Sequence, residues 1–274
     1  MHLSMNSERT YLDMETYIEN ALETLGWSDL KPTATPISKP IEDDSPLLSN
    51  EMAVKFHTAQ GMLGWLSMTC RPDIAYAHSR IGQHQSKPTE SAMEAAEYCF
   101  RYLKGSKDLC LSGPINSDKD MNLVESLMFA QTMGDQHHWE FYCDSDFAGN
   151  TEVQNKRRSQ NGYIALLNGV PVYWVSKVSS VCFASADIGE AHASTSSAES
   201  EIYAMGNATK DFMHLSYVVR EMGIPFPKPF TLQVDNEAAR VFAEDTVLRT
   251  KLKHIDTRQE WVSMLRDKNI CKPV

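Results

Sequence analysis

Apolar residues recur at helical spacing through the first third of the chain. Met14, Ile18 and Leu22 predict a helix over residues 10–25, because apolar positions three or four apart share one face of a helix. Four prolines in residues 31–50 interrupt the pattern, and this segment should be extended because proline fixes φ. Further apolar stripes predict helices over 52–69, over a short segment that ends near 85, and over 91–105.

The last of these helices has sequence signals at both ends. Ser91 and Glu94 fit a capping box, and Gly105 follows the last apolar turn and predicts the C-terminal end. We interpret its apolar stripe as core or interdomain packing. Together these helices make residues 1–110 a mainly helical region, which a weakly periodic connector over 111–136 follows.

Beyond the connector the pattern changes to alternation. Trp139, Phe141 and Cys143 share one face of residues 138–144, which is the period of a half-buried strand. Further strands are predicted at 162–167 and 170–176, which the tight-turn pair Asn168-Gly169 joins, and at 230–235. Residues 180–184 are either another strand or the far end of a bent one. Helical spacing predicts helices at 197–222, 237–242 and 257–267.

This order of elements predicts an α/β fold, a mixed sheet with flanking helices, preceded by the mainly helical region. The long helix at 197–222 joins strands of one sheet as a crossover connection. The strand that follows such a crossover should run parallel to a neighbour in the sheet.

Composition limits the classes of function. Of the 274 residues, 42% are hydrophobic and 23% charged, as in soluble globular proteins. The chain has no apolar run long enough for a membrane helix and no secretory signal at its N-terminus. Its six cysteines are scattered without a Cys-x-x-Cys pair, which favours reduced thiols over a zinc site. The net charge of −10 argues against a protein that coats nucleic acid, but it allows an enzyme that needs clustered carboxylates.

Three acidic residues lie at the ends of predicted elements. Asp144 and Asp235 end the first and fourth strands, and Glu201 lies in the first turns of the long helix. If the two strands are neighbours, the aspartates emerge side by side and the helix can bring in the glutamate. Three carboxylates that face one point repel each other unless cations neutralise them, and hard oxygen ligands suit Mg²⁺ or Mn²⁺. Two such ions about 4 Å apart can activate water and stabilise the leaving oxygen of a phosphodiester.

Each acid also has an ordinary structural interpretation. An aspartate at a strand end is commonly a turn former or a helix cap. Asp144 and Asp146 also fit the start of a calcium loop, but Ala148 stands where an EF-hand has its third ligand. Residue chemistry alone therefore reaches a two-metal carboxylate site, for which phosphodiester cleavage is one hypothesis.

Several short segments resemble the Pol polyprotein of copia-type LTR retrotransposons, in that family's order. They are residues 71–75, 101–105, 143–150, 159–163, 174–177, 196–204, 235–239 and 253–256, and the resemblance covers nearly the whole chain. It implies an RNase H-like domain over 137–274 and a polymerase-tail or connection region over 1–110.

The resemblance also implies an activity. It makes Asp144, Glu201 and Asp235 the catalytic, metal-binding acids, with Glu199 as the alternative to Glu201. The implied substrate is an RNA–DNA hybrid, whose RNA strand is hydrolysed with two Mg²⁺ or Mn²⁺ ions. The implied partner is the remainder of the Pol polyprotein, and the implied location is intracellular and cytoplasmic, including retroelement particles.

Further residues are candidates for accessory roles. Basic residues that fit phosphate contact are Lys156, Arg157, Arg158, Arg249, Lys251 and Lys253. Asp146 is either an outer-sphere acid or a turn residue, and His254 and Asp256 either assist the site or cap the last helix. Residues 186–195 lengthen the link to the helix of Glu201 beyond the family's usual one and predict an added loop near the site.

In the family, a further strand, a loop with a histidine and a last helix with a fourth acid follow the end of this sequence. We therefore expect a domain truncated at its C-terminus, which leaves an unpaired sheet edge or exposes a core face. Two alternatives to the hybrid nuclease stay open. One is an inactive fragment that at most binds nucleic acid, and the other is a nuclease of the same fold that acts on DNA.

Overall fold

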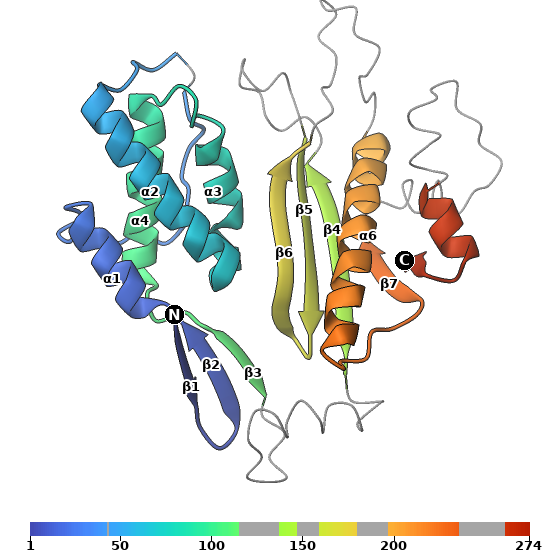
Figure 1. The fold of residues 1–274 in the computed structure, drawn as a ribbon. Coiled ribbons are helices and arrows are strands. Elements are labelled where there is room, and N and C mark those ends of the chain that lie inside the picture. Colours follow the sequence, from blue (N-terminus) through green and yellow to red (C-terminus); the bar gives the residue numbers. More distant parts are fainter. Residues whose placement is uncertain (43, 115–136, 147–158, 180–196, 236–260) are drawn as a thin grey trace, which may run out of the picture. The chain divides into compact units, whose positions relative to one another are not determined.

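The fold is that of a computed structural model, which describes residues 1–42, 44–114, 137–146, 159–179, 197–235 and 261–274. The chain divides into two compact units, Met1–Ser117 and Asp118–Val274 (Figure 1). Within the described ranges, no helix is both long and apolar enough to cross a membrane.

The described part of the first unit is built on a helical core. Its helices are α1 (Glu15–Thr24), α2 (Asn50–Thr69), α3 (Ala75–Gly82) and α4 (Glu90–Gly105), with the 3-10 turn η1 (Pro72–Ile74) before α3. The proline-rich residues 31–42 and 44–49 form no helix, as predicted. Ile18 of α1, Phe56 of α2 and Phe100 of α4 are fully buried in one core, which confirms the apolar stripes.

The same unit also contains an antiparallel sheet that the periodicity did not predict. Its strands, in order, are β1 (His2–Met5), β2 (Arg9–Asp13) and β3 (Leu111–Pro114). The prediction of one helix over 10–25 is therefore wrong in its first part, where Thr10 and Tyr11 pair with both neighbouring strands. β-branched and aromatic residues favour strands, but the pairing with β3 depends on the far end of the unit and is invisible in the local pattern.

The N-terminal end of α4 differs from the predicted capping box. Thr89 is the N-cap, and its hydroxyl accepts from the Ala92 N–H at 3.2 Å. Ser91 lies inside the helix, where its hydroxyl accepts from the Glu42 N–H at 3.0 Å. Glu94 pairs with Lys39 at 3.4 Å. The capping-box prediction is wrong because both side chains hold the proline-rich segment instead of the helix end.

The second unit contains a five-stranded mixed sheet in the order β6-β5-β4-β7-β8. Its strands are β4 (Trp139–Asp146), β5 (Gln160–Leu167), β6 (Val170–Val178), β7 (Phe230–Val234) and β8 (Cys271–Pro273). The strands β4, β5 and β6 are antiparallel, and β7 and β8 join in parallel. The predicted parallel neighbour is thus confirmed, and the arrangement is that of an RNase H-like mixed α/β fold.

Helix α6 (Ser197–Glu221) packs on this sheet and closes its core (Figure 1). Its Phe212 lies 5.0 Å from Phe141 of β4 and 6.1 Å from Phe230 of β7, measured between ring centroids. Residues 261–267 are also helical and bury Val262 and Leu265 in the same core. This packing fixes α6 over the two strands whose ends carry aspartates.

The expectation that a further strand is missing is wrong. Cys271 of β8 pairs with Phe230 of β7, and the Val274 N–H donates to the Leu232 carbonyl at 2.9 Å. The edge of β7 that we expected to be unpaired is therefore covered. A strand of three residues is too short to show a period. The predicted strand at 180–184 and helix at 237–242, and the start of the last predicted helix, lie outside the described residues.

Candidate metal centre

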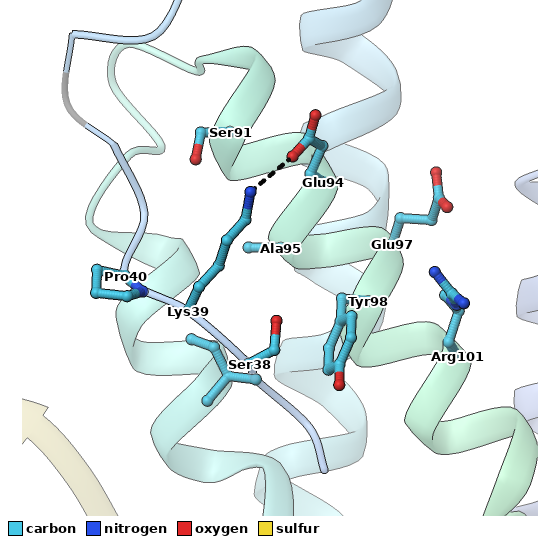
Figure 2. Close-up of a pocket in the computed structure, with 10 residues that line it drawn as sticks. Ser38, Lys39, Pro40, Ser91, Glu94, Ala95, Glu97, Tyr98 and Arg101 are labelled. Carbon is cyan, nitrogen blue, oxygen red and sulfur yellow. Dashed lines mark hydrogen bonds and ion pairs between the residues drawn. The ribbon is translucent and has the colours of Figure 1, made fainter. Parts of the chain in front are cut away.

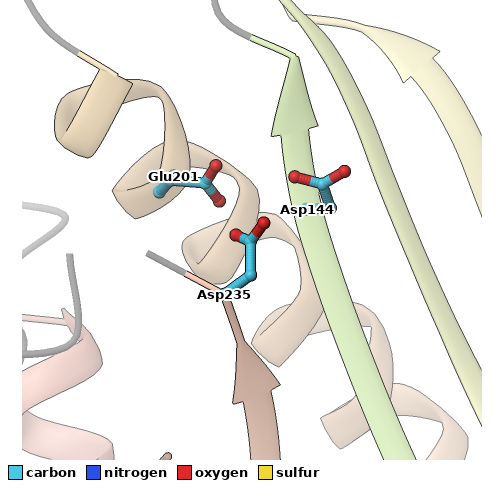
Figure 3. Close-up of side chains that lie close together, drawn as sticks. All are labelled: Asp144, Glu201 and Asp235. Atoms are coloured by element: carbon cyan, nitrogen blue, oxygen red, sulfur yellow. The ribbon is translucent and has the colours of Figure 1, made fainter. Parts of the chain in front are cut away.

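Three carboxylates meet at one end of the five-stranded sheet (Figure 3). Asp144 lies near the end of β4, Asp235 directly follows β7, and Glu201 lies in the second turn of α6. One oxygen from each lies within 4.8 Å of the others. The structure thus brings together the three acids that the sequence singled out.

The sheet register explains why the two aspartates meet. Cys143 of β4 pairs with Val234 of β7, and each aspartate is the next residue in its strand direction. Because the two strands are parallel and in this register, Asp144 and Asp235 emerge side by side at the same end of the sheet. Glu201 comes from the crossover helix, whose position the aromatic contacts of Phe212 determine.

Glu201 is the buried member of the three. Its exposed fraction is 4%, whereas Asp144 and Asp235 are exposed. Burial, and then the negative charges of Asp144 and Asp235, raise the pKa of Glu201 from 4.5 to about 8. The Ser145 backbone N–H donates to this carboxylate and opposes the shift only partly. Without a cation, the carboxyl is therefore mostly protonated at neutral pH.

The second carboxylate oxygen of Glu201 gives a direct test of whether a cation fits. This Oε2 atom is buried and has no hydrogen-bond partner within the described part of the chain. A buried carboxylate oxygen without a partner is costly, unless a cation neutralises it. Both the missing partner and the raised pKa are what a cation at this point would correct, so the three residues fit a metal ion.

Cys143 lies beside the acids but does not join them as a ligand. Burial, and then the charge of Glu201, raise the pKa of its thiol well above the usual range. The Cys143 side chain belongs to the apolar core of the sheet, and the ligand atoms that lie within 4.8 Å of one another come from the three carboxylates. The cluster therefore offers oxygen ligands, which favour hard cations.

Comparison with known proteins agrees with the resemblance that the sequence motifs indicated. No protein-family model matches the chain. Over 97% of its length the chain is 25% identical to the Retrovirus-related Pol polyprotein from transposon TNT 1-94 of Nicotiana tabacum, of which it covers 18%. Over 89% of its length it is 26% identical to the one from transposon RE1 of Arabidopsis thaliana, of which it covers 14%. The chain resembles retrotransposon Pol polyproteins.

A shorter relative extends this result. Over 65% of its length the chain is 29% identical to the putative transposon Ty5-1 protein YCL074W of Saccharomyces cerevisiae. The matched segment covers 51% of that yeast protein. The resemblance that the sequence motifs indicated is thus confirmed. The chain spans less than a fifth of the length of the two plant Pol polyproteins.

Two polar residues beside the carboxylates were missed by the sequence analysis. Ser145 and Asn161 face each other across β4 and β5, and the Ser145 hydroxyl donates to Asn161 Oδ1 at 2.9 Å. The sequence does contain a signal for them, because each is a polar residue at a strand position where the alternation predicts an apolar, inward-facing side chain. Without the register, however, nothing in the sequence paired them.

The other predicted residues lie apart from the three acids or outside the described ranges. Asp146 is exposed at the end of β4 and does not belong to the cluster. The backbone of Glu199 lies in α6, but its side chain is outside the description. The accessory and basic candidates stay predictions, because the described ranges omit Lys156, Arg157, Arg158, Arg249, Lys251, Lys253, His254 and Asp256.

The helical unit has a cavity of ≈ 210 Å³ between the proline-rich segment and α4 (Figure 2). Lys39 and Glu94 form an ion pair across it, and Glu97 and Arg101 also line it. Its two acidic and two basic groups balance, so the cavity favours neither anions nor cations. Its chemistry does not match that of the carboxylate cluster.

Proposed function

We propose that this chain provides the RNase H-type nuclease of a retrotransposon Pol polyprotein, hydrolysing the RNA strand of an RNA–DNA hybrid. The observation that carries the proposal is the group of three carboxylates within 4.8 Å, one of them with a buried oxygen that lacks a partner. The RNase H-like order of the sheet and the similarity to Pol polyproteins support it.

The proposed cofactor is a pair of Mg²⁺ or Mn²⁺ ions, which Asp144, Glu201 and Asp235 would hold. When bound, such ions activate water and stabilise the charge that develops on a phosphodiester. The three grouped ligands are all carboxylate oxygens, which favour these hard cations.

The three acids differ in burial, and we therefore assign them different roles. Asp144 and Asp235 are exposed, so they can face both a cation and a phosphate group from solvent. Glu201 is buried and anchored by the Ser145 N–H, so it holds the inner side of the site in place. The core around Phe212 keeps the helix of Glu201 at a fixed height over the sheet.

The test is cleavage of an end-labelled RNA–DNA hybrid by the full chain with Mg²⁺ or Mn²⁺. We expect metal-dependent cleavage of the RNA strand that Asp144→Asn abolishes. Asp267→Asn is the matched control, because Asp267 is exposed and pairs only with its neighbour Arg266 among the described contacts. Duplex DNA of the same sequence, tested in parallel, separates a hybrid nuclease from a DNA nuclease. A folded chain that cuts neither substrate would reject the proposal.

A further inference from the structure

A buried polar pair supports the carboxylate cluster from within the sheet. Ser145 and Asn161 are register partners on β4 and β5, with exposed fractions of 6% and 0%. The Ser145 hydroxyl donates to Asn161 Oδ1 at 2.9 Å. On the same faces of these strands, Cys143 and Tyr163 belong to the apolar core, so the pair replaces apolar residues at the end nearest the acids.

Ser145 connects this pair to the site through its backbone. The pairing of β4 with β7 ends at Cys143, and β4 continues beyond it to Asp146. The Ser145 N–H, two residues further on, donates to the Glu201 carboxylate. One residue therefore binds Asn161 with its side chain and Glu201 with its main chain.

Both residues that Ser145 binds carry a buried polar atom without a partner in the described part of the chain. Asn161 Nδ2 is a buried donor and Glu201 Oε2 is a buried acceptor, and neither has a hydrogen bond within the described part of the chain. Buried polar groups of this kind destabilise a fold, and each calls for an explanation. An asparagine that only filled space would be better replaced by an apolar side chain.

We propose that Asn161 is a positioning residue for Glu201, acting through Ser145. Its amide fixes the Ser145 side chain, and thereby the peptide N–H that holds the Glu201 carboxylate toward Asp144 and Asp235. Mutation of a residue that orients a metal ligand without touching the metal commonly weakens metal affinity by about 10- to 100-fold. The inference rests on the proposed function for its link to metal, but the positioning itself can be measured without metal.

The experiment compares Asn161→Thr with Asn161→Val. The two side chains have nearly the same shape, and only threonine can form the cross-strand hydrogen bond with a serine that sheets commonly use. Thr209→Val is the control for lost stability, because Thr209 is fully buried on α6 and contacts Trp261 rather than the acids. Amide hydrogen exchange at Ser145 in the metal-free chain and Mn²⁺ affinity by calorimetry are the two readouts.

We expect Asn161→Val to speed exchange at Ser145 and to weaken Mn²⁺ binding by about tenfold. Asn161→Thr should keep both values within about twofold of the original chain, and Thr209→Val should leave the Ser145 exchange unchanged. Unchanged exchange at Ser145 in Asn161→Val would overturn the proposal, as would equal effects of the valine and threonine variants. If the original chain bound no Mn²⁺, the proposed metal centre would fail, while the exchange data would still decide the role of Asn161.

Discussion

Asp144 and Asp235 each lie one residue beyond the paired residues Cys143 and Val234, on two parallel strands that are neighbours in the sheet. No loop is needed to bring these carboxylates together, because the strand register alone does so. Glu201 then completes the cluster from the helix that crosses the same two strands. A rigid framework of this kind suits metal-assisted chemistry, where ligands must be positioned before substrate binds.

Asp235→Asn should remove most of the proposed nuclease activity. The change keeps the side chain's shape but removes a charge that the proposed ions need. We expect the cleavage rate of the hybrid to fall by roughly three orders of magnitude, or about 4 kcal/mol of transition-state stabilisation. Single-turnover cleavage measures this rate, and circular dichroism checks that the variant is folded. Cleavage at the original rate by Asp235→Asn would remove this residue from the site.

The metal-free chain should lose stability as pH rises. The pKa of Glu201 is about 8 in the folded state and near 4.5 when the chain is unfolded, so the folded state binds more protons between these values. The free energy of unfolding should therefore decrease from about pH 4.5 to about pH 8 and level off above, by up to roughly 5 kcal/mol for this group. Urea unfolding with a chelator, at several pH values, measures the change.

Glu201→Gln is the matched control for this pH dependence. Glutamine is neutral at every pH, so the part of the slope that belongs to Glu201 should disappear while other groups titrate as before. The difference between the two unfolding curves isolates this group. If both proteins show the same slope between pH 4.5 and 8, the carboxyl does not titrate as its burial indicates.

Binding of Mn²⁺ should release a proton. At pH 7 the Glu201 carboxyl, with a pKa of about 8, is mostly protonated, and it must ionise to act as a ligand. Calorimetry in buffers with different ionisation enthalpies should therefore give close to one proton released per site at pH 7, and much less at pH 9. No proton release at pH 7 would mean that Glu201 stays outside the coordination sphere.

Arg71 should be important for the stability of the helical unit. Its side chain is buried, donates to both carboxylate oxygens of Asp73, and donates to the Ser106 carbonyl at 3.0 Å. Arg71→Met leaves these acceptors without their partner, and we expect a loss of about 3–5 kcal/mol. Thermal unfolding measures this loss. Lys39→Met, which breaks the exposed pair with Glu94, should cost less than about 1 kcal/mol. Equal shifts for the two variants would contradict this prediction.

The sequence predicted most of what depends on local pattern. The strand at 138–144, the hairpin through Asn168-Gly169 and the crossover helix follow directly from period and turn residues, and the structure shifts their ends by a few residues. Asp144, Glu201 and Asp235 could be selected because each ends or begins such an element. Their approach to within 4.8 Å, by contrast, depended on the order of strands in the sheet.

What the sequence did not reveal depends on distant partners. Strand β2 was included in a helix because its pairing partner β3 comes from the far end of the unit. Strand β8 has three residues, which is too few for a period, and only its parallel pairing with β7 shows its place. Ser145 and Asn161 look like ordinary polar residues until the register of β4 and β5 places them opposite each other.

The parallel pairing of β4 with β7 also determines when the carboxylate cluster can form during folding. The two strands are separated along the chain by β5, β6 and α6, so Asp144 and Asp235 are brought together only by the pairing of distant segments. A cation that both residues hold can therefore bind only after β4 and β7 have paired. For the nuclease proposed above, activity would begin only once this pairing has formed, however much of a longer polyprotein has been synthesised.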